Sequence, residues 1–131
     1  MAAALYPGEY RRPITAASLD RADSAVVVAR LDGAAVGLCV LFDRGDGSAE
    51  LKRMVVDAGS RDGGVGMALL RGAEAEAARL GAGVVLLEVG TRNVEAQRLY
   101  RRGGYEACEA FPPYVQTAIS LFMRRVLGEM G

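Results

Sequence analysis

The chain has no histidine, no tryptophan and a single lysine, Lys52. The lack of histidine excludes a Ser–His or Cys–His nucleophile pair and a histidine-ligated metal site, so we expect no metal. The two cysteines, Cys39 and Cys108, lie among apolar residues, and we expect them to be reduced core thiols. No apolar run is long enough to span a membrane, and the N-terminus lacks the charged and then apolar profile of a signal peptide. These absences favour a cytoplasmic protein.

Charge and length narrow the class of protein further. Sixteen basic residues balance sixteen acidic ones, so the composition gives no sign of a nucleic-acid or membrane partner. With 131 residues, 51% of them hydrophobic, the chain is long enough for one packed core but not for two. We therefore expect one globular domain that spans residues 1–131.

Hydrophobic periodicity predicts a mixed α/β fold. Asp32-Gly33 is a two-residue hairpin signal, and the run after it, residues 35–42, is expected to be buried on both faces because nearly all of it is apolar. Asn93 is placed to cap a helix. The expected elements, in chain order, are a helix over 15–23, antiparallel strands over 25–31, 35–42 and 49–57, a helix over 67–80, a parallel strand over 84–89, a helix over 94–102, and a closing antiparallel pair over 105–111 and 119–126.

A loop rich in glycine joins the strand over 49–57 to the helix over 67–80. Such a loop presents unpaired backbone N–H groups at the positive end of the helix dipole, which is typical of a phosphate or pyrophosphate site. A P-loop is excluded because it needs Gly-Lys-Ser/Thr, and the only lysine lies inside the preceding strand. A dinucleotide fingerprint is excluded because Leu69 stands where its third glycine should be. The glycines of the loop are Gly59, Gly63, Gly64 and Gly66.

What remains is an Arg-x-x-Gly-x-Gly run over residues 61–66, and it resembles the pyrophosphate loop of the GCN5-related N-acetyltransferases, the GNAT family. A second stretch, Asn93 followed by Leu99-Tyr100 and Gly103-Gly104-Tyr105, is similar to the family's second signature. The resemblance covers about residues 24–126. It implies the GNAT-like acyl-CoA N-acyltransferase fold, a central mixed β-sheet flanked by helices, with acetyl-coenzyme A as the co-substrate.

The same resemblance implies which residues bind coenzyme A. Backbone groups of residues 54–56 would hold the pantetheine arm and the oxyanion of the reaction, where the sheet splays. Arg61 and the N–H groups of residues 62–67 would take the pyrophosphate, with the Asp62 side chain turned to solvent. Asn93 would contact the pantetheine arm as well as cap its helix. The expected cofactor-binding residues are Met54, Val55, Val56, Arg61, Asp62, Gly63, Gly64, Val65, Gly66, Met67 and Asn93.

Two catalytic residues are also implied by the resemblance. Tyr100 occupies the leaving-group position, where a phenol would protonate the departing thiolate of coenzyme A; the alternative is a core tyrosine packed on its helix neighbours. Glu50 stands eleven residues before Arg61, the offset of the general-base glutamate in the family's histone-acetylating branch. The alternative for Glu50 is an edge-exposed carboxylate paired with Lys52. For Tyr114, between the last two strands, we favour a surface turn tyrosine over a residue that lines the acceptor slot.

We therefore predict an acetyl-coenzyme A-dependent N-acetyltransferase that acts on the primary amine of a small molecule or amino acid. The amine should attack the thioester directly, because neither cysteine has the electropositive setting that lowers the pKa of a nucleophilic thiol. The alternative is a non-catalytic acyl-CoA-binding or regulatory module. Kinetics with a panel of amines would separate the two.

The beginning of the chain predicts an oligomer. The family usually opens with a further strand and helix, and residues 1–10 are too short and too polar to supply both. The strand over 25–31 would then be an open, β-branched edge, which is an association hazard. We expect a second copy to cover it, which predicts a homodimer; a mis-set start codon is the alternative.

Overall fold

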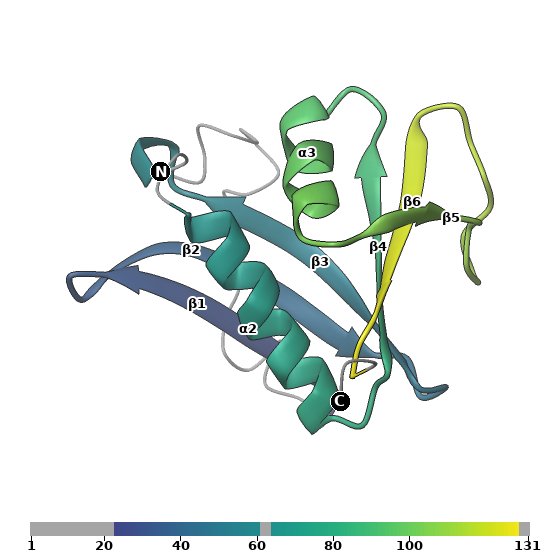
Figure 1. Ribbon diagram of the computed structural model, residues 1–131, viewed down its shortest axis with the longest axis horizontal. Helices are drawn as coiled ribbons and strands as arrows, with labels where there is room; N and C mark the ends of the chain where they lie inside the picture. The colour runs from purple at the N-terminus through teal and green to yellow at the C-terminus, as the bar shows by residue number, and fades with distance from the viewer. Residues whose placement is uncertain (1–22, 61–63, 129–131) are drawn as a thin grey trace.

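The computed structural model describes residues 23–60 and 64–128 (Figure 1). Most of the helix expected over residues 15–23, and the loop residues Arg61, Asp62 and Gly63, lie outside the described residues. Within the two described ranges, no helix is long and apolar enough to cross a membrane. The elements are β1 (Ser24–Leu31), β2 (Ala34–Asp43), β3 (Ser48–Val56), the 3-10 helix η2 (Ala58–Ser60), α2 (Val65–Arg79), β4 (Val84–Gly90), α3 (Val94–Arg102), β5 (Glu106–Cys108) and β6 (Ser120–Val126).

Six strands form one sheet in the order β1-β2-β3-β4-β6-β5. β3 and β4 pair in parallel, and every other neighbouring pair is antiparallel. α2 makes the crossover from β3 to β4 and lies across one face of the sheet (Figure 1). This arrangement confirms the predicted mixed α/β fold with a closing antiparallel pair. β5 is shorter than the expected residues 105–111, because Phe111 leaves the sheet to pack against other aromatic rings.

Local sequence signals set the turns and the helix starts. Asp32 and Gly33 both have positive φ, 52° and 84°, as the tight hairpin between β1 and β2 requires. Gly64 precedes α2 with φ 84°, a conformation that favours glycine. The Asn93 side chain accepts a hydrogen bond from the Ala96 N–H at 3.2 Å, so the predicted helix cap is confirmed.

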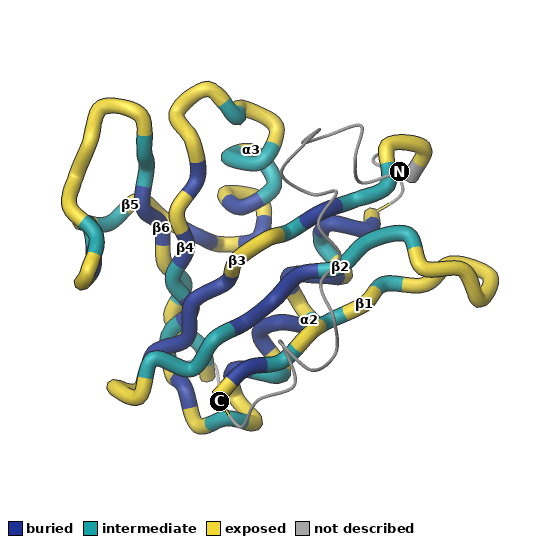
Figure 2. Tube along the Cα trace, turned by 180° about the vertical axis from the view of Figure 1, so that it is seen from behind, coloured by how far each residue is buried: buried dark blue, intermediate teal, exposed yellow. Residues whose placement is uncertain are grey.

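The core lies between α2 and the sheet. The α2 residues that face the strands recur at three- and four-residue spacing and are fully buried: Leu69, Leu70, Ala73 and Ala77. Strand side chains alternate between the two faces, so Leu51 of β3 enters this core while Glu50 and Lys52 point to the opposite face. Figure 2 shows the sheet from behind: β2 is buried along its middle, whereas β3 is buried over its first four residues and exposed over the next two, where it continues past β4.

Two burial predictions need correction. β2 is buried on both faces only over Cys39, Val40 and Leu41, because its first residues belong to a hairpin that extends past the end of α2 (Figures 1 and 2). Cys39 is a core thiol as expected, and burial raises its pKa to about 12. Cys108 is only half-buried, because β5 is the outer strand of the sheet. Both cysteines are free thiols.

Candidate active site

β3 separates from β4 halfway along its length. Their parallel pairing runs from Ser48 to Leu51 of β3 and ends there. On its other side, the register of β3 with β2 shifts so that one extra residue is accommodated between Lys52 and Val55. Arg53, inside this bulge, has φ 55°, which is uncommon for a residue other than glycine. The bulge bends β3 away from β4 and opens the sheet beside Met54.

Two hollows meet at this opening. They share Met54 of β3, together with Asn93 and Tyr100 at the start and on the body of α3. The first, the carboxylate hollow, has a volume of about 440 Å³ and is lined by Glu50, Leu51, Lys52, Arg53, Glu88, Val89, Gly90 and Tyr114 as well. The second, the arginine hollow, has a volume of about 800 Å³ and is also lined by Val56, Gly64, Gly66, Met67, Arg92, Glu95, Ala96, Arg98, Leu99 and Arg102.

The arginine hollow has the electrostatics of an anion site. The first turn of α2 faces it, and that turn contains no acidic residue to compete for the N–H groups that lack helical acceptors. Arg92, Arg98 and Arg102 line the same hollow, and no ion pair joins any of them to an acidic residue in the described ranges. The sequence did not single out these arginines, because basic residues towards the end of α3 are also expected to complement the dipole of that helix.

The expected cofactor-binding residues do not all contribute in the same way. The side chains of Met54, Val56 and Met67 line the arginine hollow. Val55 and Val65 are 4% and 7% exposed, and Val65 belongs to the core cluster under α2, so only the backbones of these two residues are available to a ligand. A Cβ on Gly66 would lie 2.8 Å from Leu99 Cδ2, so this glycine also permits the close approach of α2 and α3.

Tyr100 is both a packed residue and a lining residue. It is 8% exposed, belongs to the core cluster and places its ring centroid 6.1 Å from that of Tyr105. It also lines both hollows. The two interpretations of this tyrosine, core packing and a position at the reacting centre, are therefore compatible.

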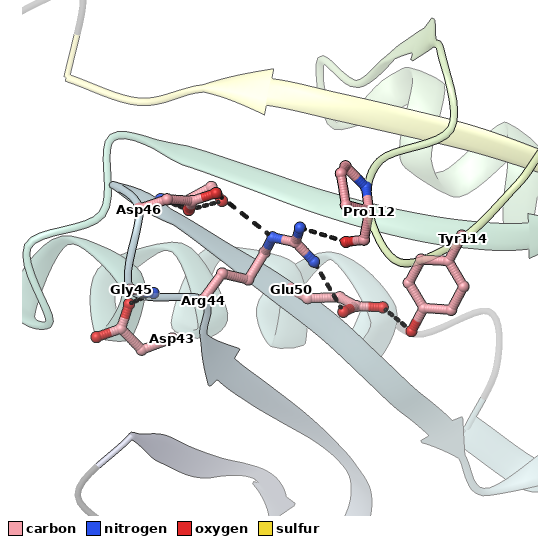
Figure 3. Close-up of polar contacts among 8 residues, drawn as sticks. Asp43, Arg44, Gly45, Asp46, Glu50, Pro112 and Tyr114 are labelled. Carbon is pink, nitrogen blue, oxygen red and sulfur yellow. Dashed lines mark hydrogen bonds and ion pairs between the residues drawn. The ribbon is translucent and has the colours of Figure 1, made fainter.

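Glu50 is buried, and its carboxylate has two partners (Figure 3). The Tyr114 hydroxyl donates to Oε2 at 2.8 Å, and Nη1 of Arg44 lies 3.6 Å from Oε1. The alternative of an edge-exposed carboxylate paired with Lys52 was wrong, since Glu50 is 6% exposed. The Lys52 ammonium lies instead 5.7 Å and 5.8 Å from the ring centroids of Phe42 and Tyr114.

Tyr114 is not the surface turn tyrosine that we favoured. It is half-buried, and its ring packs edge-on against Phe111 and tilted against Phe122, with centroids 5.4 Å and 5.9 Å apart. Burial, and then the hydrogen bond to Glu50, raise the pKa of the Tyr114 phenol. The sequence signal was the pair of aromatic residues on either side of Pro112-Pro113, which anchor the loop on the sheet.

Arg44 was missed entirely, and it connects this loop to β3. Its side chain is 15% exposed, its guanidinium lies 4.9 Å from the centroid of the Phe111 ring, and Nη2 donates to the Pro112 carbonyl (Figure 3). It follows β2 in a short turn, where a surface arginine is the ordinary expectation.

No group of three His, Cys, Asp or Glu side chains in the described ranges is placed to hold a metal ion.

Solved structures define the class to which this fold belongs. The chain superposes with a TM-score of 0.78 on a protein from Klebsiella pneumoniae assigned as an acyl-CoA N-acyltransferase, at 32% identity over 81% of this chain and 74% of that one. It also resembles the PaiA N-acetyltransferase of Thermoplasma acidophilum, solved in complex with coenzyme A, with a TM-score of 0.69 and 20% identity over 79% of this chain and 61% of that one. The fold is the acyl-CoA N-acyltransferase fold.

Sequence comparison defines the family. The model of the acetyltransferase (GNAT) family matches residues 2–105. A curated relative, an IAA acetyltransferase from Azospirillum brasilense, is 36% identical over 124 residues, which is 94% of this chain and 81% of the relative. The chain therefore belongs to the GNAT family of acetyltransferases, as its two signatures predicted.

Proposed function

We propose that this protein is an acetyl-coenzyme A-dependent N-acetyltransferase whose acceptor is the primary amine of a small molecule or amino acid. Membership of the GNAT family supports acetyl transfer. The observation that carries the rest is the meeting of two different hollows at Tyr100: three arginines and the first turn of α2 line one, and the other holds the carboxylates of Glu50 and Glu88 beside Lys52 and Arg53. A polyanionic donor suits the first, and the two carboxylates of the second can bind an amine.

The residues present fit coenzyme A. The first turn of α2, from Gly64 to Met67, offers backbone N–H groups to a pyrophosphate, and we propose that Arg61, Asp62 and Gly63 complete this loop. Backbone groups of residues 54–56, freed from β4 by the bulge, would hold the pantetheine arm together with Asn93. When bound, acetyl-coenzyme A supplies the activated acetyl group as a thioester.

In the proposed mechanism each residue has one task. Glu50 is the general base that removes a proton from the acceptor ammonium, because only a neutral amine can attack the thioester. Backbone N–H groups of residues 54–56 stabilise the oxyanion that forms as the C–N bond is made. Tyr100 then donates its proton to the sulfur as the C–S bond breaks, the second proton lost by the acylated nitrogen restores the Tyr100 phenol, and the proton on Glu50 passes to solvent. The products are an N-acetyl amine and the free thiol of coenzyme A.

Thiol release tests this proposal. The protein is incubated with acetyl-coenzyme A and each member of a panel of small amines, amino acids and peptides, and the free thiol is measured; calorimetry measures coenzyme A binding in parallel. We expect turnover with at least one small amine or amino acid. Coenzyme A binding without turnover for any member would identify a non-catalytic binding module instead, and acetylation of peptides alone would refute the acceptor class.

We also propose that the protein acts in the cytoplasm as a homodimer joined through β1. β1 is the last strand of the described sheet on its side. Val26, Val28 and Leu31 of β1 are 39%, 41% and 56% exposed, which is unusual for three large apolar side chains on one strand. A second copy that pairs with β1 would cover these residues.

A further inference from the structure

Tyr114 and Glu50 form a hydrogen bond whose direction is fixed by chemistry. A carboxylate can only accept, so the Tyr114 hydroxyl must be the donor at 2.8 Å. The phenol oxygen then has no proton left for any other partner, and only its lone pairs remain. Both residues line the carboxylate hollow. The phenol therefore offers this hollow an acceptor, which is suited to the N–H group of an amine.

Glu50 is poorly placed to meet an amine alone. It is 6% exposed, one of its oxygens is bonded to Tyr114, and the other faces the Arg44 guanidinium at 3.6 Å. Tyr114 is the more exposed member of the pair and lies on the loop between β5 and β6. The phenol oxygen keeps its lone pairs towards the hollow, where the Lys52 side chain also faces it, so an amine bound there would meet the phenol while both contacts of Glu50 stay in place.

We propose that Tyr114 is a second acid–base residue of the acceptor site, which takes a proton from the acceptor ammonium while it passes its own proton to Glu50. This inference rests on the proposed function. One N–H bond of the ammonium breaks as an O–H bond forms on the phenol, and the original phenol O–H bond breaks as a new one forms on the Glu50 carboxylate. A cation and an anion become a neutral amine and a neutral carboxylic acid, and Tyr114 ends as it began.

The surroundings of the pair suit such a relay. The rings of Phe111 and Phe122 hold the phenol in one orientation, so little freedom must be lost when the amine binds. The raised pKa of Tyr114 keeps its proton in place at neutral pH. The other titratable or charged groups that face the pair or its hollow are Arg44 from the turn after β2, Lys52 and Arg53 from β3, Glu88 from β4 and Tyr100 from α3.

The pH dependence of kcat/KM tests the relay, measured with the best amine of the thiol-release panel. In the wild type, an ammonium ion can be used directly, so kcat/KM should be nearly flat around neutral pH. In Tyr114→Phe only the neutral fraction of the amine can react, so kcat/KM should fall about 10²- to 10⁴-fold at pH 7 and rise about tenfold per pH unit towards the pKa of the amine. The Phe ring keeps the contacts with Phe111 and Phe122, and calorimetry with coenzyme A verifies that the donor site is intact.

Two comparisons make the result specific. Tyr105→Phe removes a comparable hydrogen bond between a tyrosine and a glutamate, Glu74, and neither of these residues lines a hollow. The pH dependence of kcat/KM in this variant should therefore keep the wild-type shape. The hydrazide analogue of the same amine, neutral at pH 7, needs no proton transfer before attack, so Tyr114→Phe should acetylate it at close to the wild-type rate.

Three results would overturn the inference. An unchanged pH profile in Tyr114→Phe, with an active wild type, would leave the proposed function standing and remove the relay. Equal loss of activity towards the amine and its hydrazide would assign Tyr114 to substrate positioning. A wild type that acetylates no amine would remove the relay together with the proposed function.

Discussion

Removal of the Tyr105 hydroxyl should destabilise the fold without changing the chemistry. This hydroxyl donates to Oε2 of Glu74 at 2.9 Å, and Glu74 is 8% exposed. The same carboxylate accepts from Arg125 at 2.6 Å and from Arg71 at 2.9 Å and 3.1 Å, and Arg71 also donates to the Gly103 carbonyl. The network joins α2 to β6 and to the end of α3, so it supports the helix that carries Tyr100.

The structure sets the size of the effect. Tyr105→Phe leaves Glu74 with both arginines, so no charge is orphaned and the loss is that of one hydrogen bond to a charged group, about 1.5–3 kcal/mol. For a chain of this length that free energy corresponds to a fall in Tm of about 5–15 °C. Glu74→Leu should cost more than Tyr105→Phe, because it removes the carboxylate from Arg125 and from Arg71, which keeps only the Gly103 carbonyl, and leaves the buried Tyr105 phenol without its acceptor.

Urea unfolding followed by circular dichroism measures both variants. Burial, with the Glu74 charge second, raises the pKa of Tyr105 above its ordinary value of about 10. The contribution of the Tyr105 hydroxyl to the free energy of unfolding is therefore complete below pH 10 and is lost as the pH rises further. The difference in stability between wild type and Tyr105→Phe should narrow in alkali. A gap below about 0.5 kcal/mol at pH 7, in the range of ordinary surface substitutions, would show that the hydrogen bond contributes nothing.

Three further predictions follow from the site and the sheet edge. Tyr100→Phe should lower kcat about 10²-fold with calorimetric affinity for coenzyme A unchanged, and full activity would assign the leaving-group proton elsewhere. Gly66→Ala should push Leu99 outward and lower the free energy of unfolding by about 1–3 kcal/mol, an effect partly offset by the higher helix propensity of alanine. The same variant should bind coenzyme A more weakly in calorimetry, and an unchanged affinity would contradict the place of Gly66 in the donor site. Light scattering should report a dimer, weakened by Val28→Lys on β1, and a thermally stable monomer across micromolar concentrations would refute it.

Much of the fold could be read from neighbouring residues. Hydrophobic periodicity placed every described strand and both described α-helices, though not the 3-10 helix η2. Asp32-Gly33 and Asn93 marked a turn and a helix start, because each acts through bonds that span only a few residues. The strand predicted over residues 105–111 was too long because that prediction, too, used only neighbouring residues. Residues 105–111 are apolar enough for a strand, but periodicity cannot tell an aromatic residue that pairs in a sheet from one, such as Phe111, that packs beside it.

The proposed donor side of the site rests on local sequence patterns, and the proposed acceptor side does not. The loop before α2 and the signature around Tyr100 are local patterns, because a helix N-terminus and a residue on the next helix are set by short stretches of chain. The acceptor side depends on contacts between distant residues. Tyr114 forms a hydrogen bond with Glu50, which lies 64 positions away in the sequence, and Arg44 forms one with Pro112, which lies 68 positions away. No local sequence pattern predicts either hydrogen bond.

The burial of Glu50 could not be predicted from the residues beside it in the sequence. Alternation within β3 predicts that Glu50 and Leu51 lie on opposite faces, because the period of a strand is a property of the backbone, but only the structure shows that the face of Glu50 is the one opposite α2. Whether that face is open to water depends on the loop between β5 and β6, which folds over it and brings Phe111 and Tyr114. Packing of distant segments thus makes Glu50 a buried and hydrogen-bonded carboxylate and rules out the alternative of an edge-exposed one, because burial depends on the whole arrangement of the chain and not on the residues beside Glu50.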